Sequence, residues 1–175
     1  MRKLFILLAI MMMSTSILLA QDANFRDASW GMSKAEVKEA EDKQLLQEKV
    51  DVLYYADTME DQQMYVIYKF AGEEKQLHQG QYILQSELTN ESQYIDFYKV
   101  LESNYRDQYG SPRVDTTLVQ AEKYMGSPSQ YSSGLKSGDV RFQTSWDTKE
   151  TEILMQLWNG NRGIQLAIQY IDKNA

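Results

Sequence analysis

The residues of this chain that offer chemistry are a single histidine and two pairs of acidic residues. His78 is the only histidine, and the chain contains no cysteine. A zinc site needs several His, Cys or carboxylate ligands held close together, so the sequence does not predict one. A Ser-His-Asp triad would need His78 as its base, but no Gly-x-Ser-x-Gly turn is available to carry the nucleophile. We interpret His78 as an exposed residue at the end of a strand.

Acidic residues hydrolyse glycosidic bonds when two of them face each other across a cleft, about 5–10 Å apart. The pairs available here are Glu73 with Glu74 and Glu150 with Glu152. Both pairs fall at predicted turns or strand edges, where a solvated carboxylate is the expected state. We therefore predict no catalytic residue, no metal ligand and no cofactor, and hence a protein that is not an enzyme. A hydrolase that uses acidic residues is the less favoured alternative.

Tyrosine is the positive signal, with 12 tyrosines among 175 residues. Tyrosine and tryptophan are preferred anchors of protein interfaces. Tyr65 and Tyr82 lie on neighbouring predicted strands. Trp158 alternates with Leu157, so it points away from the core face of its strand. A concave sheet face that carries Tyr65, Tyr82 and Trp158 is the candidate binding surface. The alternative is that the tyrosines flank the core of a tyrosine-rich domain.

The strand that carries Trp158 belongs to the clearest pattern in the chain. Apolar and polar residues alternate through three segments, which predicts strands with one buried face. Short polar breaks separate them, including Asn159-Gly160, and such breaks favour tight turns between antiparallel strands. The three predicted strands are 140–147, 151–158 and 164–170.

The first half of the chain predicts a short helix followed by three strands. Ser33 and Glu36 form a capping box at the start of a helix expected over residues 34–43. The strands that follow are expected at 50–56, 63–70 and 77–88. Gly80, inside the third of these, marks a bulge or a close approach of another group.

A longer helix separates the two halves of the chain. Apolar residues recur at spacings of three and four from Tyr94 to Tyr109, behind a capping segment at Thr89–Ser92, and Gly110 and Pro112 end the helix. Residues 113–124 are compatible with either a strand or a helical turn. Residues 126–138 are rich in Ser and Gly and predict a flexible loop.

These elements predict an α+β fold in which helices cover one face of an antiparallel sheet. Both helices begin with capping residues and precede a meander. We therefore expect two related helix-plus-meander units (α-β-β-β repeated), at about residues 30–88 and 89–175, within one domain.

The N-terminal residues have the layout of a secretory signal peptide. Arg2 and Lys3 are basic, residues 4–13 are wholly apolar, and the segment continues to the small residue Ala20. We predict a signal peptide at residues 1–20 and one α+β domain at 21–175. The alternative is a membrane anchor, but the apolar run is shorter than the about 20 residues that a spanning helix needs.

Export predicts a periplasmic or secreted protein. Without cysteine the chain can carry no cysteine-linked lipid and no disulfide, so we expect no lipoprotein and a stability that comes from an ordinary core. Cleavage would leave 16 basic and 25 acidic residues, a net charge of −9. Such a charge repels nucleic acid and anionic lipid, so neither is an expected partner.

The start of the first helix resembles a known signature. Gly31-Met32-Ser33-x-x-Glu36-Val37 is similar to the Gly-Met-Thr-x-x-(Gln/Glu)-Val start of the SmpA/OmlA small outer-membrane-assembly lipoprotein domain. The layout resembles the β-lactamase-inhibitor-protein-like fold, which stacks two helix-plus-meander units. The Trp30-Gly31-Met32-Ser33 start, Tyr109-Gly110-Ser111-Pro112 and the pattern from Thr151 to Tyr170 also resemble small exported bacterial proteins of unknown function. This chain lacks the lipidated cysteine of the lipoproteins, and the resemblance carries over no catalytic residue.

Together these patterns predict an exported, non-catalytic binding or inhibitor-like module of the bacterial cell envelope. Its expected partner is a protein or a glycan of the envelope. An envelope assembly or chaperone-like factor is the alternative that the resemblance favours.

Overall fold

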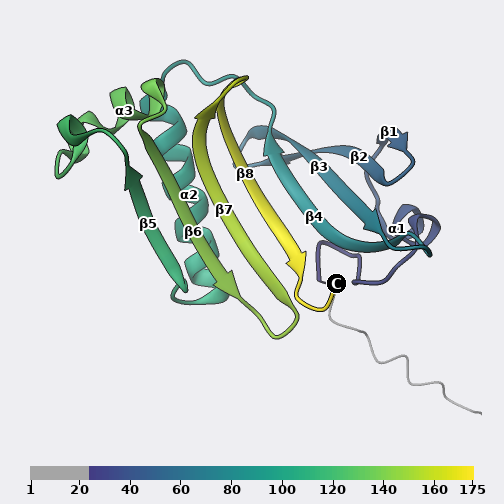
Figure 1. Ribbon diagram of the computed structural model, residues 1–175. Helices are drawn as coiled ribbons and strands as arrows, with labels where there is room; N and C mark the ends of the chain where they lie inside the picture. The colour runs from purple at the N-terminus through teal and green to yellow at the C-terminus, as the bar shows by residue number, and fades with distance from the viewer. Residues whose placement is uncertain (1–23) are drawn as a thin grey trace, which may run out of the picture.

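The structure is a computed structural model that describes residues 24–175. The predicted signal peptide, residues 1–20, lies outside the described residues. One antiparallel sheet forms the centre of the molecule (Figure 1). Its strands are β1 (Leu45–Lys49), β2 (Val52–Met59), β3 (Gln62–Ala71), β4 (Gln76–Leu84), β5 (Val114–Val119), β6 (Val140–Asp147), β7 (Thr151–Gly160) and β8 (Gly163–Asp172). The helices are α1 (Lys34–Ala40), α2 (Glu91–Tyr109) and α3 (Tyr131–Ser137), with 3-10 turns at Glu122–Tyr124 and Pro128–Gln130.

The eight strands lie in the order β1-β2-β3-β4-β8-β7-β6-β5. Helix α1 precedes β1 to β4, and α2 precedes β5 to β8. The last strand of each half, β4 and β8, pairs antiparallel with the other at the middle of the sheet. The predicted α+β class with an antiparallel sheet is therefore confirmed. Four strands follow α1 where three were expected, and after α2 the strand left open within residues 113–124 is present as β5, so four strands follow that helix too.

The two predicted helix starts have the capping contacts that the sequence indicates. The Glu36 carboxylate accepts from the Ser33 backbone N–H at 2.8 Å, and the Ser33 hydroxyl accepts in turn from the Glu36 backbone N–H. At the start of α2 the Asn90 side chain accepts from the Gln93 backbone N–H at 3.1 Å. Gly110 ends α2 with a φ of +79°, a conformation that glycine adopts without a steric penalty.

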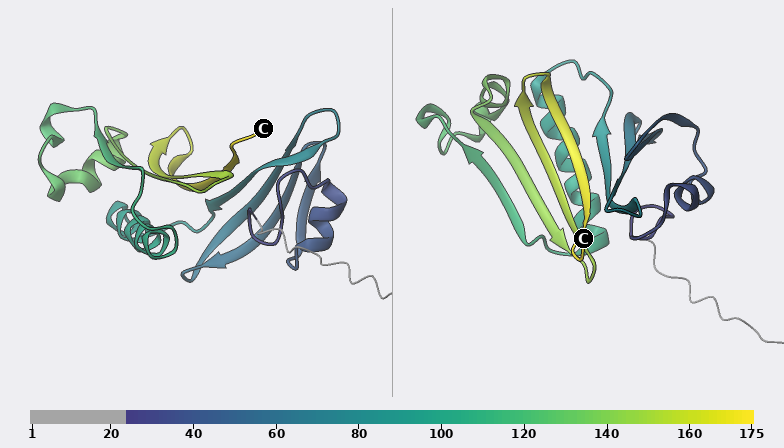
Figure 2. Two further views of the ribbon diagram at one scale, coloured as in Figure 1. Left: turned by 90° about the horizontal axis from the view of Figure 1, so that it is seen from below. Right: turned by 45° about the vertical axis from the view of Figure 1, so that its right-hand side comes forward.

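The helices cover one face of the sheet. Strand pairing places Tyr68, Gly80, Tyr170, Ile153 and Trp146 in one row across β3, β4, β8, β7 and β6. The Tyr105 ring of α2 contacts Trp146 and Tyr170 in this row. Glu41, directly after α1, accepts a hydrogen bond from Tyr68 in the same row. In the left view of Figure 2, α2 lies against the strands of the second half and α1 lies next to the strands of the first half. This arrangement buries one continuous core, and no helix of residues 24–175 lies on the other face.

The segment before α1 completes the core. Phe25 is 1% exposed, and its ring centroid lies 5.0–5.1 Å from those of Tyr68, Tyr82 and Tyr170. A Cβ at Gly80 would lie 2.1 Å from the Phe25 ring. Of the two explanations that the sequence offered for Gly80, the close approach of another group therefore applies, and that group is the Phe25 ring.

Residues 126–138 are packed against the sheet, so the prediction of a flexible loop is wrong. They contain the Pro128–Gln130 turn and helix α3. Leu135 is fully buried, and Tyr131 stacks edge-on against Phe142 of β6. A Cβ at Gly134 would lie 2.3 Å from Val140. The small residues thus allow a short helix to lie close against β6.

Candidate functional site

The helix-free face of the sheet is the candidate site, and we define it by the side chains that point away from the helices. Strand pairing places Tyr65, Ile83, Ala167, Gln156 and Gln143 in one row across β3, β4, β8, β7 and β6. In Figure 1 α2 passes behind the strands, so the viewer looks at this face of β5 to β8. An antiparallel sheet is stable with one face on a core and the other toward solvent, so the fold itself leaves this face available.

Glutamine and large apolar side chains share the helix-free face. Most of them are half-buried rather than extended into water, and a few at the centre are buried although no described helix covers them. Gln79 donates to Gln169 at 3.0 Å, and Gln156 donates to Gln143 at 3.1 Å. The face is therefore ordered by its own contacts. Its glutamines are Gln79, Gln81, Gln143, Gln156, Gln165 and Gln169, and its large apolar residues include Tyr54, Tyr65, Ile67, Ile83, Leu154, Trp158 and Ile171.

Two hollows meet at Trp158. The first, of about 290 Å³, lies between β5, β6 and β7 and is lined by Leu118, Arg141, Phe142, Gln143, Gln156 and Trp158. The second, of about 530 Å³, lies over the β7–β8 hairpin and is lined by Arg141, Trp158, Asn159, Gly160, Asn161, Arg162 and Gln165. Arg141 and Trp158 belong to both. We call Trp158, Arg141 and Arg162, with the amides around them, the Trp158 corner.

The structure separates the three residues that the sequence grouped as a binding surface. Tyr65 and Trp158 both point to the helix-free face. Their strands, β3 and β7, are three strand spacings apart, about 14 Å across the sheet, and the two residues lie one row apart along the strands. Tyr82 pairs with Val66 and points to the helix-covered face, where it is 9% exposed against Phe25. The prediction that Tyr82 belongs to the same surface as Tyr65 is therefore wrong. Two residues on paired strands share a face only if the register of the pairing allows it, and here it does not.

Tyr82 instead lines a cleft of about 380 Å³ on the helix-covered side, together with Asn24, Arg26, Met59, Leu101, Asn104, Tyr105, Gln108, Tyr109 and Tyr170. The Tyr105 and Tyr170 hydroxyls share a hydrogen bond of 2.7 Å. Burial raises the pKa of both tyrosines above its usual value. Two neutral hydroxyls bonded to each other satisfy a polar core. We interpret this cleft as structural.

Arg26 closes one side of that cleft with a buried ion network. Its guanidinium bonds both oxygens of Glu41, at 2.8 and 3.1 Å, and Asp57 at 2.6 Å. Tyr68 donates to Glu41 at 2.5 Å. Burial alone would raise the pKa of Glu41, but the hydrogen bonds from Tyr68 and Arg26 outweigh it, and the pKa lies below its usual range. The network stabilises the fold by joining the N-terminal segment to α1, β2 and β3.

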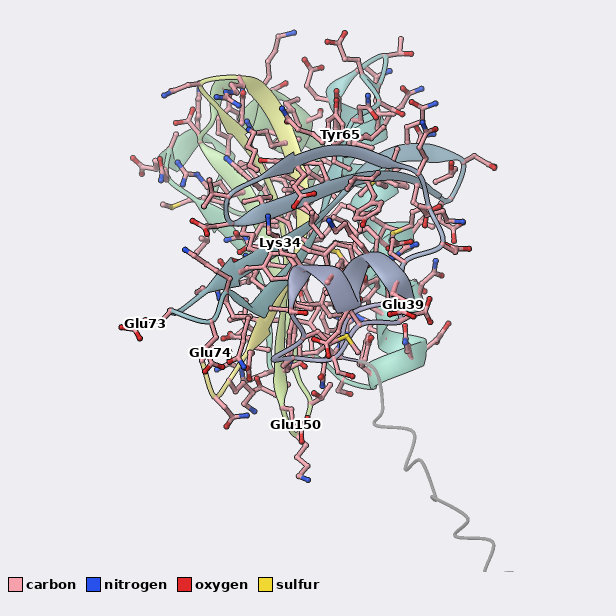
Figure 3. The ribbon with its side chains drawn as sticks, turned by 90° about the vertical axis from the view of Figure 1, so that its right-hand side faces the viewer. Lys34, Glu39, Tyr65, Glu73, Glu74 and Glu150 are labelled. Atoms are coloured by element: carbon pink, nitrogen blue, oxygen red, sulfur yellow. The ribbon has the colours of Figure 1, made fainter. Side chains whose placement is uncertain are left out.

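The residues with catalytic potential lie apart from one another. Glu73 and Glu74 are exposed at the β3–β4 turn, and Glu150 lies at the β6–β7 turn, as Figure 3 shows from the side. Glu152 is 2.5 Å from Arg113. His78 is half-buried on β4 and forms no side-chain hydrogen bond within residues 24–175. No group of three or more His, Cys, Asp or Glu suited to a metal occurs in the described part of the chain.

Where the pKa of a described carboxylate departs from its usual value, it is lowered. The pKa is lowered at Glu36, Glu41, Glu48, Asp57 and Glu91, by a hydrogen bond or a cation in each case. A general acid needs a raised pKa. The hydrolase hypothesis therefore gains no support from these groups.

The arginines and glutamines of the Trp158 corner were not singled out from the sequence. The alternation in 140–147 and 151–158 does put Arg141, Gln143 and Gln156 on the outward side of their strands. Which of them adjoin Trp158 depends on the pairing of β6 with β7, which alternation alone does not give.

Comparison with protein-family models, with curated proteins and with solved structures found no match. The resemblances noted in the sequence therefore stay predictions. Within residues 24–175, none of the helices combines the length and the apolar character that crossing a membrane requires.

Proposed function

We propose that this protein is an exported, non-catalytic binding module, and that its helix-free sheet face is the contact surface for a partner protein of the cell envelope. The observation that carries the proposal is that no helix of residues 24–175 covers this sheet face, while the face presents half-buried aromatic and aliphatic side chains. Large apolar surfaces rimmed by polar groups mark interaction sites in soluble proteins. Trp, Tyr and Arg, which dominate binding energy in protein interfaces, are present on it as Trp158, Tyr65 and Arg141.

A protein fits this face better than a small molecule. Both hollows at Trp158 open onto a broad surface, and the large apolar residues lie on five neighbouring strands, β2, β3, β4, β8 and β7. Only a large partner would cover Tyr65 and Trp158 at once. An envelope assembly or chaperone-like factor would use the same face in the same way, so it is a variant of this proposal.

We also propose that the chain consists of two related units, about residues 30–88 and 89–175. Support comes from the strand order, in which the fourth strands of both halves meet and the first strands lie at the two edges. A capped helix precedes the strands in each half. In this arrangement Tyr65 comes from the first unit and Trp158 from the second, so a partner that contacts both would bind across the junction.

Export is part of the proposal and rests on the basic and apolar N-terminal residues. The test is cell fractionation of the full-length chain, followed by N-terminal sequencing of the product. A chain that begins after Ala20 and lies outside the cytoplasm is expected. An intact N-terminus in the cytoplasmic fraction would contradict export.

The binding proposal is tested by capture from envelope extract with the full chain, tagged at its C-terminus. The β8 strand runs from the Trp158 corner to the C-terminus, so the tag lies at the opposite end of the strands (Figure 1). A specific partner should be lost when Tyr65→Ala and Trp158→Ala are combined. It should be retained by Val100→Ala, which removes an exposed apolar side chain from α2 on the other side. Equal capture by both variants would refute the proposal.

A further inference from the structure

Within residues 24–175, the two arginines that form no ion pair both lie at the Trp158 corner. Residues 24–175 contain five arginines. Arg26, Arg106 and Arg113 each form ion pairs. Arg141 and Arg162 form none within the described residues, and both line the hollows beside Trp158. In a chain with a formal net charge of −7, two free guanidinium groups at one point are an unexpected arrangement.

The indole of Trp158 adds a third free donor. The other two tryptophans donate their ring N–H groups at 3.0 Å, Trp30 to the Thr151 hydroxyl and Trp146 to the Gly110 carbonyl. The Trp158 ring N–H donates to no acceptor in the described part of the chain. A Cβ at Gly160 would lie 3.2 Å from that nitrogen, so glycine gives the ring the space it occupies. The corner thus offers hydrogen-bond donors from an aromatic ring and two cations.

No Asp or Glu lines either hollow. Acidic side chains lie instead at the far end of β6 and β7, where Arg113 holds Asp147 at 3.0 Å and Glu152 at 2.5 Å. Six residues along each strand separate the two ends, which is about 20 Å. The two ends of the helix-free face therefore differ in charge. The acidic side chains at one end are paired with Arg113, whereas the arginines at the other end form no ion pair within residues 24–175.

Resting on the binding function proposed above, we propose that the Trp158 corner binds a carboxylate-bearing segment of an acidic polypeptide. Guanidinium groups recognise carboxylates through paired, charge-assisted hydrogen bonds. Leu118 lines the first hollow and is 48% exposed. An apolar side chain of the bound segment, next to its carboxylate, could pack on Leu118. A polypeptide supplies acidic and apolar groups side by side, whereas an acidic glycan supplies few apolar ones.

The test uses nuclear magnetic resonance of the full chain, because each tryptophan ring N–H gives its own signal and Trp158→Phe identifies the relevant one. The probes are an acetylated hexaglutamate peptide, a hexaglutamine peptide and an oligogalacturonate. Hexaglutamate should shift the Trp158 signal saturably and leave the Trp30 and Trp146 signals in place. Hexaglutamine should not shift it. A response to oligogalacturonate without one to hexaglutamate would overturn the choice of a polypeptide.

The arginines are tested by the double variant Arg141→Gln, Arg162→Gln, which should weaken hexaglutamate binding by about tenfold or more. The matched control is Lys99→Gln, Lys149→Gln, which changes the net charge equally but alters exposed lysines on α2 and the β6–β7 turn. The control should bind as the wild type does. Equal affinity of the two double variants would overturn the inference. If the captured partner needs Trp158 but not the arginines, the inference fails while the proposed function stands.

Discussion

Replacing Glu41 by glutamine removes the charge at the centre of the buried ion network. The Glu41 side chain is 2% exposed and accepts two bonds from Arg26 and one from Tyr68. The glutamine side chain would keep nearly the same shape. It would leave Arg26, whose side chain is 13% exposed, opposite a neutral amide with one acceptor oxygen.

Breaking one side of a buried ion pair costs about 3–5 kcal/mol. Asp57 remains 2.6 Å from Arg26 and still compensates part of its charge, so we expect the lower end, about 3 kcal/mol. For a domain of this size each kcal/mol lowers the melting temperature by about 2–4 °C, which gives about 6–12 °C. Urea unfolding at pH 7, followed by circular dichroism, measures the loss of unfolding free energy directly.

The difference between wild type and Glu41→Gln should depend on pH. The folded-state pKa of Glu41 is lowered, so its contribution is fully present above the unfolded pKa of about 4.3 and is lost as the pH falls through the folded pKa. The difference between the two unfolding free energies should therefore begin to shrink as the pH falls below about 4.3 and should vanish below the folded-state pKa. Glu39→Gln, on the exposed side of α1, is the control and should stay within about 0.5 kcal/mol of wild type (Figure 3). A Glu41→Gln variant no less stable than this control, or a difference independent of pH, would refute the reasoning.

Three further substitutions test the packing by urea unfolding. Leu135→Ala should cost about 2–5 kcal/mol because Leu135 is fully buried, and a loss under about 0.5 kcal/mol would mean that α3 is not packed on the sheet. Gly80→Ala should cost about 1–3 kcal/mol through its collision with Phe25, and Phe25→Leu should recover part of that loss in the double variant; additive losses would argue against the contact. Trp158→Ala should change stability by less than about 1 kcal/mol, since the half-exposed ring has no internal hydrogen bond, and a larger loss would make Trp158 a structural residue.

The parts of the fold that depend on local chemistry could be predicted from the sequence. The Ser33 and Glu36 cap, the Asn90 cap and the Gly110 end of α2 each follow from side chains within a few residues of each other. The strands β6, β7 and β8 were predictable because apolar residues recur at every second position of each, although Leu154, Trp158 and Ile171 interrupt the polar side.

The remaining elements depend on tertiary contacts. All five residues of β1 are exposed, and Leu45 and Leu46 stand side by side, so no alternation marks this edge strand. Helix α3 has a composition that favours turns, and tertiary contacts stabilise it, among them the burial of Leu135 and the packing of Tyr131 on Phe142. Packing on β6 thus overrides local preference in this segment.

The orientation of Trp158 could be predicted from the sequence, but the set of residues that form the candidate site could not. The sequence indicates that Trp158 points outward, and the structure agrees. The face of Tyr82 depends on the pairing of β3 with β4, where Tyr65 lies opposite Ile83 rather than Tyr82. One residue of register moves a side chain to the other face, and no local pattern fixes that register.

Site-specific photo-crosslinking in the source cells tests the central claim most directly. A photoreactive phenylalanine analogue is placed at Tyr65 or Trp158 on the helix-free face, or at Val100 on α2 as the control. Binding through the helix-free face predicts the same cross-linked protein from Tyr65 and Trp158 and none from Val100. Cross-links from Val100 alone would contradict the account, and so would their absence at both Tyr65 and Trp158.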